Sequence, residues 1–397
     1  MNYLKFQWNI DVEKNPLDLK IEDYLDVALR NNAKRKFLFI SKKLGKHLPV
    51  NPNKVNELGQ MLAYLYKREN EEYKKEKSVV IGFAETATAL SHSFFNYLEG
   101  AEAFLHTTRE EVNYLEKLEF KEEHSHAVEQ GLYIEYLDKF KELDTVILVD
   151  DEITTANTCI NMIKEFQNRY TAKKYIIASL LNWISVEREE EIRNIGETLG
   201  CEIEFIYLFG GSFEFILDHN YKIEDQVEKI KEGLNRDAKI NYINLNLEKY
   251  ILEEKYIKYT GRFGINRDEH EELKKIIKRE GKKLKVNDKK SKILALGIEE
   301  FMYIPMMLSR EIGGDIYYHS ITRSPIIPIK NKDYPIRSKY EFKSFYNDNI
   351  NYLYNLDIQK YDECFLFIEL YKDEKRIDDL IKIFKSLGIK VINIVMC

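Results

Sequence analysis

The residues with the most specific chemistry lie between Val146 and Thr158, which read VILVDDEITTANT. Four apolar β-forming residues precede Asp150 and Asp151, and this pattern predicts a buried parallel strand that ends in two carboxylates. A polar loop follows and leads into an apolar-periodic segment, so its hydroxyls and N–H groups would precede a helix N-terminus and bind an anion. Ionised Asp only accepts hydrogen bonds, whereas a cis-diol offers two donors. The stretch therefore predicts a sugar-phosphate site.

The alternative is a purely structural role, in which a buried strand is followed by a capped helix and both aspartates are solvated. A second loop makes the first interpretation stronger. The sequence GFAETATAL follows an apolar strand expected at residues 78–81 and leads into an apolar helix. A Gly-led loop between a strand and a helix is another anion site.

Val146 to Thr158 resembles the substrate motif of the type I phosphoribosyltransferases, in which four apolar residues, two acidic residues and a threonine-rich loop follow one another. The resemblance implies that Asp150 and Asp151 hold the ribose hydroxyls of 5-phosphoribosyl-1-pyrophosphate (PRPP). It also implies that the loop cradles the 5-phosphate through Thr154, Thr155, Ala156, Asn157 and Thr158. Ala156 stands where the family usually has Gly, so the loop either avoids a positive φ there or tolerates modest strain.

The same resemblance assigns the pyrophosphate of PRPP to the earlier loop, through Ala84, Glu85, Thr86 and Ala87. Glu85 would repel pyrophosphate unless Mg²⁺ intervened, and the resemblance implies that the enzyme requires this cation. Asp150 and Asp151 would then meet the metal only indirectly, through Mg²⁺ and PRPP.

The charged segment 110–131 occupies the place of the family's flexible catalytic loop, which closes over the substrate and excludes water. It follows Arg109 and contains EEHSHA, and we expect catalytic roles for Arg109, Glu123, His124 and His126. The two histidines are two positions apart, so an extended segment would place both on one side. A metal site and an inert surface stay open as alternatives.

The N-terminal region, residues 1–50, is expected to form a hood over the acceptor. Helical spacing predicts a helix over residues 21–31 and a short strand over residues 37–40. Lys46 and His47 crowd a turn at Gly45 and could face an anionic substrate, with solvated surface as the alternative.

The second half of the chain is built like the first. The segments from Lys77 and from Ser291 both run strand, Gly, acidic loop, apolar helix, Gly, strand and Thr-Arg, and DECFLFIE at 362–369 aligns with DTVILVDD at 144–151. This alignment replaces Asp150 by Ile368 and Asp151 by Glu369, so the second copy should not bind ribose phosphate in the same way. A chance pattern is the alternative.

The segment TRSP at 322–325 resembles the name-giving motif of the TRSP domain, which follows a phosphoribosyltransferase domain in proteins encoded near bacterial tellurium-resistance and stress genes. TGRFG at 260–264 belongs to the same resemblance. We expect a second site on an anionic group, formed by Arg262, Thr322, Arg323 and Ser324. In the structural alternative, Arg323 caps a helix or pairs with an acidic neighbour such as Glu299 or Glu300.

Composition limits the remaining classes of protein. The 61 basic and 67 acidic residues give a net charge of −6, which argues against a general nucleic-acid or membrane-surface protein. The four cysteines form no CxxC pair, so we expect a reduced, cytoplasmic protein. The sequence contains no run of eighteen apolar residues, so it predicts no membrane span. PRPP and a small-molecule acceptor are the expected partners, with a homodimer as an open alternative.

The predicted fold class is α/β, a type I phosphoribosyltransferase-like parallel sheet flanked by helices and followed by a second, smaller α/β domain of related but degenerate topology. The expected boundaries are 1–215 for the first domain, 216–290 for a charged bridging region and 291–397 for the TRSP domain. The resemblance implies a glycosyltransferase that moves ribose 5-phosphate from PRPP to a nitrogen nucleophile, releasing pyrophosphate, in the biosynthesis of a nucleoside-like metabolite. A non-catalytic PRPP-binding regulator and cleavage in the reverse direction stay open.

Overall fold

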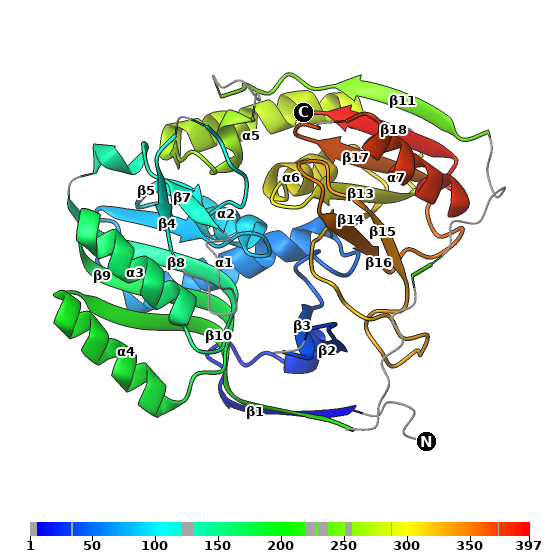
Figure 1. The fold of residues 1–397 in the computed structure, drawn as a ribbon. Coiled ribbons are helices and arrows are strands. Elements are labelled where there is room, and N and C mark those ends of the chain that lie inside the picture. The colour runs from blue at the N-terminus through cyan, green and yellow to red at the C-terminus, as the bar shows by residue number, and fades with distance from the viewer. Residues whose placement is uncertain are drawn as a thin grey trace. The chain divides into compact units, whose positions relative to one another are not determined.

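The chain folds into two compact units that interleave along the sequence (Figure 1). The computed structural model describes residues 6–32, 35–113, 115–120, 130–140, 142–218, 227–228, 237–250, 256–286, 288–371 and 373–397. The first unit comprises Met1–Lys20, Asn56–Asp218 and Lys258–Glu272, and the second comprises Ile21–Val55, His219–Ile257 and Leu273–Cys397. This division differs from the expected boundaries, because residues 21–55 fold with the second unit and residues 258–272 with the first.

A seven-stranded sheet forms the centre of the first unit, in the order β1-β10-β9-β8-β4-β5-β12. The strands from β10 to β5 are mutually parallel, and β1 and β12 pair antiparallel at the two edges. In this order the strands are β1 Phe6–Lys14, β10 Glu202–Leu217, β9 Thr171–Asn182, β8 Glu142–Ile153, β4 Ser78–Gly82, β5 Ala101–His106 and β12 Ile265–Asn266.

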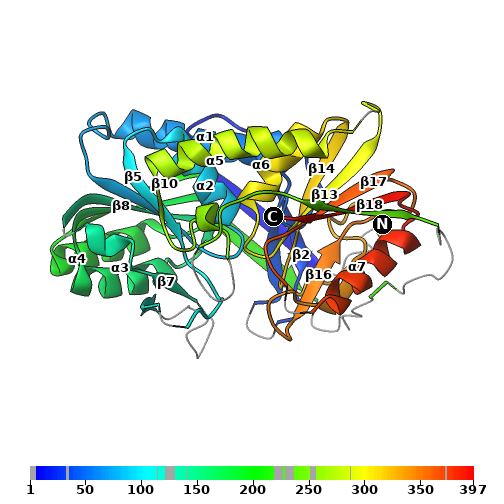
Figure 2. The same cartoon turned by 90° about the horizontal axis from the view of Figure 1, so that it is seen from above.

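Helices cover both faces of this sheet. Figure 2 shows α3 (Asn157–Arg169) and α4 (Val186–Leu199) on one face, and α2 (Thr88–Tyr97) on the other together with α1 (Pro52–Glu69). A short antiparallel pair, β6 (Lys117–Glu119) and β7 (Gly131–Tyr133), lies between β5 and β8 in the sequence. Among the described residues, no helix has the length and apolar character needed to cross a membrane.

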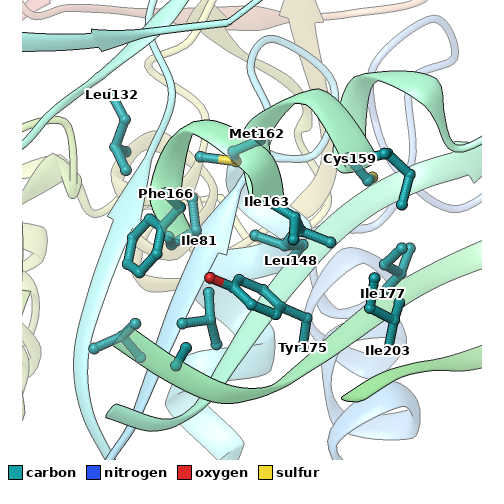
Figure 3. Packing of buried hydrophobic residues seen from close by; sticks show 14 of the residues in the cluster. Ile81, Leu132, Leu148, Cys159, Met162, Ile163, Phe166, Tyr175, Ile177 and Ile203 are labelled. Atoms are coloured by element: carbon teal, nitrogen blue, oxygen red, sulfur yellow. The ribbon is translucent and has the colours of Figure 1, made fainter. Parts of the chain in front are cut away.

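The core of the first unit explains why its strands are continuous apolar runs. All five residues of β4 are buried, as are Val146 to Val149 of β8. Met162, Ile163 and Phe166 of α3 pack onto this sheet against side chains such as Leu148 and Tyr175 (Figure 3). Complete burial of one such side chain contributes about 1.5–3 kcal/mol, so this layer fixes α3, and with it the loop that precedes α3.

Strand β10 runs through a pair of glycines. Adjacent glycines often mark a turn, yet β10 continues past Gly210 and Gly211 to Leu217 and pairs with β1. The glycine allows this pairing, because a Cβ at Gly211 would lie only 1.9 Å from the carbonyl oxygen of Asp11. Close backbone approach, and not a turn, accounts for this glycine.

The second unit has a five-stranded parallel sheet in the order β11-β18-β17-β13-β14. The strands are β11 Lys239–Asn244, β18 Val391–Met396, β17 Glu363–Ile368, β13 Lys292–Ile298 and β14 Asp315–Ile321, and an antiparallel pair adds β15 Lys339–Lys343 and β16 Ile350–Tyr354. Helix α6 (Tyr303–Ile312) connects β13 to β14, and α7 (Lys375–Ser386) connects β17 to β18. Helix α5 (Arg267–Gly281) begins in the first unit and ends in the second.

The N-terminal segment of the second unit corrects one helix prediction. Residues 25–29 form strand β2 (Leu25–Leu29), which pairs antiparallel with β3 (Phe37–Ser41). The strand at 37–40 is confirmed, but the helix over 21–31 is wrong apart from a short 3-10 turn at Ile21–Asp23. Most side chains of β2 are buried, so the apolar residues mimic helical spacing while tertiary packing selects the strand.

The internal similarity of the two halves is confirmed by their topology. The order β9-β8-β4-β5 in the first sheet corresponds to β18-β17-β13-β14 in the second. Their registers agree as well, since Gly82 pairs with His106 and Gly297 pairs with Ser320. Likewise, Ile81 of β4 pairs with Leu148 of β8, and Leu296 of β13 pairs with Leu366 of β17.

The loops that follow these strands also correspond. Thr108 bridges to Gly131 of β7, and Thr322 bridges to Tyr352 of β16. Each threonine hydroxyl accepts a hydrogen bond from the backbone N–H two residues later, at 3.1 Å in both units. The second unit is therefore a structural repeat of the first, down to the turn that follows its second strand.

Candidate active site

The acidic pair lies where β8 separates from β4. Gly82, the last residue of β4, pairs with Val149, whereas β8 continues beside β9 until Ile153 pairs with Asn182. From Asp150 onward, one edge of β8 has left its β4 partner. This point is the topological switch of the sheet, because the chain connections from β4 and from β8 run in opposite directions, and ligands of open α/β sheets bind there.

The two carboxylates of the pair influence each other. Asp150 and Asp151 are both half-buried, and the backbone N–H of Asp151 donates to Oδ1 of Asp150 at 2.9 Å. Burial raises the pKa of Asp150 well above its usual range, and the charge of Asp151 adds to this increase. Such a pair is stabilised by hydroxyl donors or by a nearby cation, which would favour its ionised form.

The loop after β8 ends in a left-handed residue that begins α3. Ala156 has φ 60° and ψ 11°, so of the two possibilities left open by the sequence, the loop tolerates a positive φ without a glycine. The hydroxyl of Thr155 accepts from the N–H of Asn157 at 3.3 Å. Ala156 has no side chain that could cap the first turn of α3, so the helix N-terminus presents backbone donors to this loop.

Arg188 holds this loop from outside and was not identified from the sequence. It lies in the first turn of α4, where its Nη2 donates to Oδ1 of Asn157 at 2.7 Å and its Nε donates to the carbonyl oxygen of Thr155 at 3.4 Å. The sequence shows only a charged helix at this position, and nothing in its spacing relates Arg188 to residues 155–157. The contact arises because α3 and α4 lie on the same face of the sheet (Figure 2).

The loop after β4 lies beside the acidic pair and is held by buried hydroxyls. The N–H of Phe83 donates to the carbonyl oxygen of Val149 at 3.0 Å, which ties this loop to β8. The N–H of Ala84 donates to Oγ1 of Thr107 at 2.8 Å, and that hydroxyl donates to Oε1 of Gln130 at 2.6 Å. Ala84, Glu85 and Ala87 are buried, while Thr86 is half-buried. The predicted pyrophosphate loop and the predicted ribose site therefore adjoin.

The remaining expected catalytic residues divide into described and undescribed ones. Arg109 is half-buried and follows β5 at the same end of the sheet as Asp150 and Asp151. Glu123, His124 and His126 lie outside the described residues. Within the described part of the chain, no group of three or more His, Cys, Asp or Glu side chains is arranged to hold a metal ion.

Lys46 and His47 belong to the second unit and are not solvated surface. Their side chains are buried, and Nζ of Lys46 donates to the carbonyl oxygen of Glu299 at 3.4 Å. Burial lowers the pKa of His47 well below its usual value, and the charge of Lys46 lowers it further. The expected hood is thus divided, with β1 in the sheet of the first unit and residues 21–55 in the second.

The four residues expected to form a second site do not share one unit. Arg262 lies in the first unit, whereas Thr322, Arg323 and Ser324 lie in the second. The reason is strand β12, which follows Arg262 and pairs with β5.

Arg323 pairs with the acidic neighbour Glu299, as the structural alternative expected. Its Nε donates to Oε2 of the fully buried Glu299 at 2.5 Å, and Ser344 and Asn351 donate to the other oxygen of that carboxylate. Ser324 is held at its carbonyl oxygen, which accepts from the hydroxyl of Tyr354. The TRSP motif therefore forms an internal network of the second unit.

Comparison with known protein families and structures adds an independent finding. Residues 24–212 match the family described as phosphoribosyl transferase, and residues 259–384 match the TRSP domain that lies C-terminal to it. No curated protein matches the sequence.

Among solved structures, similar chains include the adenine phosphoribosyl transferase of Trypanosoma brucei (12% identity, 49% of this chain and 80% of that chain, TM-score 0.36). The adenine enzyme of Giardia lamblia is similar too (14% identity, 46% and 92%, TM-score 0.32). So is a hypoxanthine-guanine phosphoribosyltransferase of Bacillus anthracis (17% identity, 36% and 74%, TM-score 0.23).

Proposed function

We propose that this chain, whose residues 24–212 belong to the phosphoribosyl transferase family and whose residues 259–384 belong to the TRSP domain family, transfers ribose 5-phosphate from PRPP to a nitrogen nucleophile. The observation that carries the proposal is the position of Asp150, Asp151 and the loop before α3. They meet the loop after β4 at the topological switch of the sheet.

Each part of PRPP has a matching group in this arrangement. The carboxylates of Asp150 and Asp151 accept from the two ribose hydroxyls, and each charge-assisted bond contributes about 1.5–3 kcal/mol. Residues 154–158 and the N-terminus of α3 donate to the 5-phosphate. The loop Ala84–Ala87 receives pyrophosphate, and Arg109 neutralises part of its charge.

The protein groups at this site would supply only part of the ligands of a Mg²⁺ ion. The ionised form of Asp150 is disfavoured by burial and by the charge of Asp151, which suits a cation that is bound nearby through the substrate and retained waters. When bound, Mg²⁺ would neutralise charge on the pyrophosphate leaving group.

In the proposed reaction the bond between C1 and the pyrophosphate oxygen breaks, and a bond from the acceptor nitrogen to C1 forms. Pyrophosphate leaves with the electron pair of the broken bond, and the proton of the acceptor nitrogen passes to the departing pyrophosphate or to solvent. The chain's own residues bind and orient, because holding two reactants in the correct geometry supplies much of the rate. Glu123, His124 and His126 are proposed to act on the leaving group or the acceptor, in the biosynthesis of a nucleoside-like metabolite.

Pyrophosphate release tests the proposal. The full chain is incubated with PRPP, Mg²⁺ and a mixture of nitrogenous bases and amines, and ribose-phosphate adducts are identified by mass. We expect Asp151→Asn to lower turnover at least about tenfold. Asp144→Asn is the matched control, because Asp144 lies on the same strand at the opposite end of the sheet, where it pairs with Lys173.

The outcomes separate the alternatives. Full activity of Asp151→Asn would contradict the assignment of the site. Tight PRPP binding without turnover, with every acceptor tried, would favour a regulatory PRPP-binding protein. Release of PRPP from a nucleotide and pyrophosphate would favour the reverse direction.

A further inference from the structure

Residues 258–272 lie largely inside the TRSP match, yet they complete the first unit. Within this segment, Ile265 and Asn266 pair with Phe104 and Ala103 of β5. The carbonyl oxygen of Gly261 accepts from the N–H of His106 at 3.0 Å. The segment therefore runs along β5 to its carboxyl end, which is the end that carries the proposed active site.

The two glycines of TGRFG are required by this close packing. Gly261 has φ 95°, and a Cβ there would lie 2.3 Å from the ring of Phe104. Gly264 has φ 82°, and a Cβ there would lie 2.4 Å from the ring of Tyr136. Both the conformation and the space exclude larger residues, so glycine is required at both positions for the segment to lie against the sheet in this way.

Arg262 lies between these glycines and is completely buried. Its Nε donates to Oγ1 of Thr108 at 3.3 Å, and that hydroxyl also accepts from the N–H of Glu110 at 3.1 Å. Thr108 in turn exchanges backbone hydrogen bonds with Gly131, at 2.8 and 3.1 Å. Arg262 thus fixes the residue from which the chain leaves β5 toward Arg109.

The neighbouring side chain extends the same support. The ring of Phe263 packs against Tyr133, with centroids 5.5 Å apart. The hydroxyl of Tyr133 donates to the carbonyl oxygen of Glu110 at 2.9 Å and accepts from the N–H of Val112 at 2.7 Å. Arg262 and Phe263 therefore hold residues 108–112 and 131–133 together, next to Thr107, which holds the Ala84 N–H.

We propose that Arg262 is a positioning residue for phosphoribosyl transfer, supplied to the first unit by the TRSP part of the chain. It orients Thr108 and Arg109 relative to the loop Ala84–Ala87 and does not itself contact PRPP. This inference rests on the proposed function. Because a misplacement of about 1 Å can cost about 100-fold in rate, losing this support should lower kcat more than it weakens PRPP binding, since Asp150, Asp151 and residues 154–158 still hold the ribose 5-phosphate.

The variants are chosen to separate positioning from packing. Arg262→Met keeps the length of the side chain but removes its donors, and Arg262→Lys keeps a donor and the charge. Thr108→Val removes the accepting hydroxyl at nearly constant volume. Arg267→Ala is the matched control, because Arg267 lies on the same segment and donates to the carbonyl oxygens of Phe95 and Leu98 at the end of α2, away from Thr108.

We expect Arg262→Met and Thr108→Val each to lower kcat about 10- to 100-fold, with a clearly smaller loss of PRPP affinity. Arg262→Lys should recover part of the loss. The double variant should be little worse than either single one, since both remove the same contact. Arg267→Ala should lower the melting temperature and leave kcat nearly unchanged.

A second readout does not depend on turnover. Hydrogen exchange followed by mass spectrometry should show faster exchange in peptides covering 83–87 and 106–112 for Arg262→Met and Thr108→Val. Arg267→Ala should instead affect peptides covering 95–101. If the wild type releases no pyrophosphate, the proposed function fails, and this readout still decides whether Arg262 holds residues 83–87 and 106–112 in place. Unchanged exchange at 83–87 and 106–112 in Arg262→Met, unchanged kcat, or a kcat loss that Arg267→Ala reproduces would overturn the inference.

Discussion

At the scale of single residues, the acidic pair lowers the stability of the fold near neutral pH. Asp150 is held beside Asp151 in a half-buried position, and its raised pKa means that folding disfavours its ionised form. A group that serves only the fold would not be kept in this state, since its replacement should stabilise the protein. The pH dependence of stability therefore reports on the site without any ligand.

We expect Asp150→Asn to raise the melting temperature near pH 7. The unfolded chain ionises Asp near its usual pKa of about 3.9, whereas the folded protein resists ionisation up to a higher pH. Stability of the wild type is thus lost as pH rises through this window, and the variant avoids that loss. Melting temperatures measured from pH 4 to pH 8 should show an advantage for Asp150→Asn that shrinks toward pH 4.

Asp144→Asn supplies a control of opposite sign on the same strand. The bond from Lys173 lowers the pKa of Asp144, as does the bond from the N–H of Lys77. Its stabilising contribution is present above the usual pKa and is lost as pH falls through the lowered one. Asp144→Asn should therefore lower the melting temperature near pH 7, and a pH-independent difference for both variants would contradict the electrostatic account.

Ala156 should carry conformational strain. Its left-handed φ of 60° costs an alanine about 1–2 kcal/mol, while glycine adopts it freely but loses more entropy on folding. We expect Ala156→Gly to raise the free energy of unfolding slightly, by up to about 1 kcal/mol. Denaturant unfolding measures this change, and a clear destabilisation would show that the Ala156 methyl group contributes packing that outweighs the strain.

At the scale of elements, the loop before α3 depends on α4. Arg188 extends from α4 to residues 155 and 157, so the loop before α3 is held by a neighbouring helix as well as by its own strand. A hydrogen bond from a charged group contributes about 1.5–3 kcal/mol when shielded from water and less when exposed.

Arg188→Ala should therefore weaken PRPP binding by roughly tenfold or less while it changes stability only slightly. Arg193→Ala is the control, since Arg193 lies on the same helix but pairs with Glu189. Binding measured by calorimetry should separate the two variants. Equal PRPP affinity of Arg188→Ala and wild type would show that the loop holds its shape without α4.

The elements also show which features the sequence could predict. Strands β4, β8 and β9 are apolar runs that end in polar loops, so their ends and the site between them follow from local patterns. Strand β12 has only two residues, and β2 carries an apolar pattern that also fits a helix, so neither could be assigned without its partner strand. Sequence spacing could not predict the contacts of three other side chains, because their partners lie far away in the sequence. These side chains are Arg188, Gln130 and Arg262, the last in its contact with Thr108.

At the scale of the whole molecule, the chain contains one fold twice, with different side chains at the equivalent positions of the two copies. In the first unit the loop after β4 and the end of β8 bear Ala84 and Asp151, and the equivalent positions in the second unit are Glu299 and Glu369. There, Glu299 accepts from Arg323, Ser344 and Asn351, and Glu369 accepts from the hydroxyl of Tyr346 and the N–H of Ile257. The second unit thus uses these positions for internal hydrogen bonds, so we expect one PRPP site per chain.

Because the two units interleave, the chain cannot be cut between the two family matches without removing parts of both units. A cut after residue 212, where the phosphoribosyl transferase match ends, would remove β12 and Arg262 from the first unit. It would also separate residues 21–55 from the unit with which they fold. The two family matches are therefore not two independent folding units.

Calorimetric titration of the full chain with PRPP and Mg²⁺ tests the central claim most directly. We expect one binding event per chain, weakened at least about tenfold in Asp151→Asn and unchanged in Glu369→Gln, which alters the equivalent position of the second unit. Binding that is equally tight in Asp151→Asn, or two binding events of which Glu369→Gln removes one, would contradict the assignment of the PRPP site to the first unit alone.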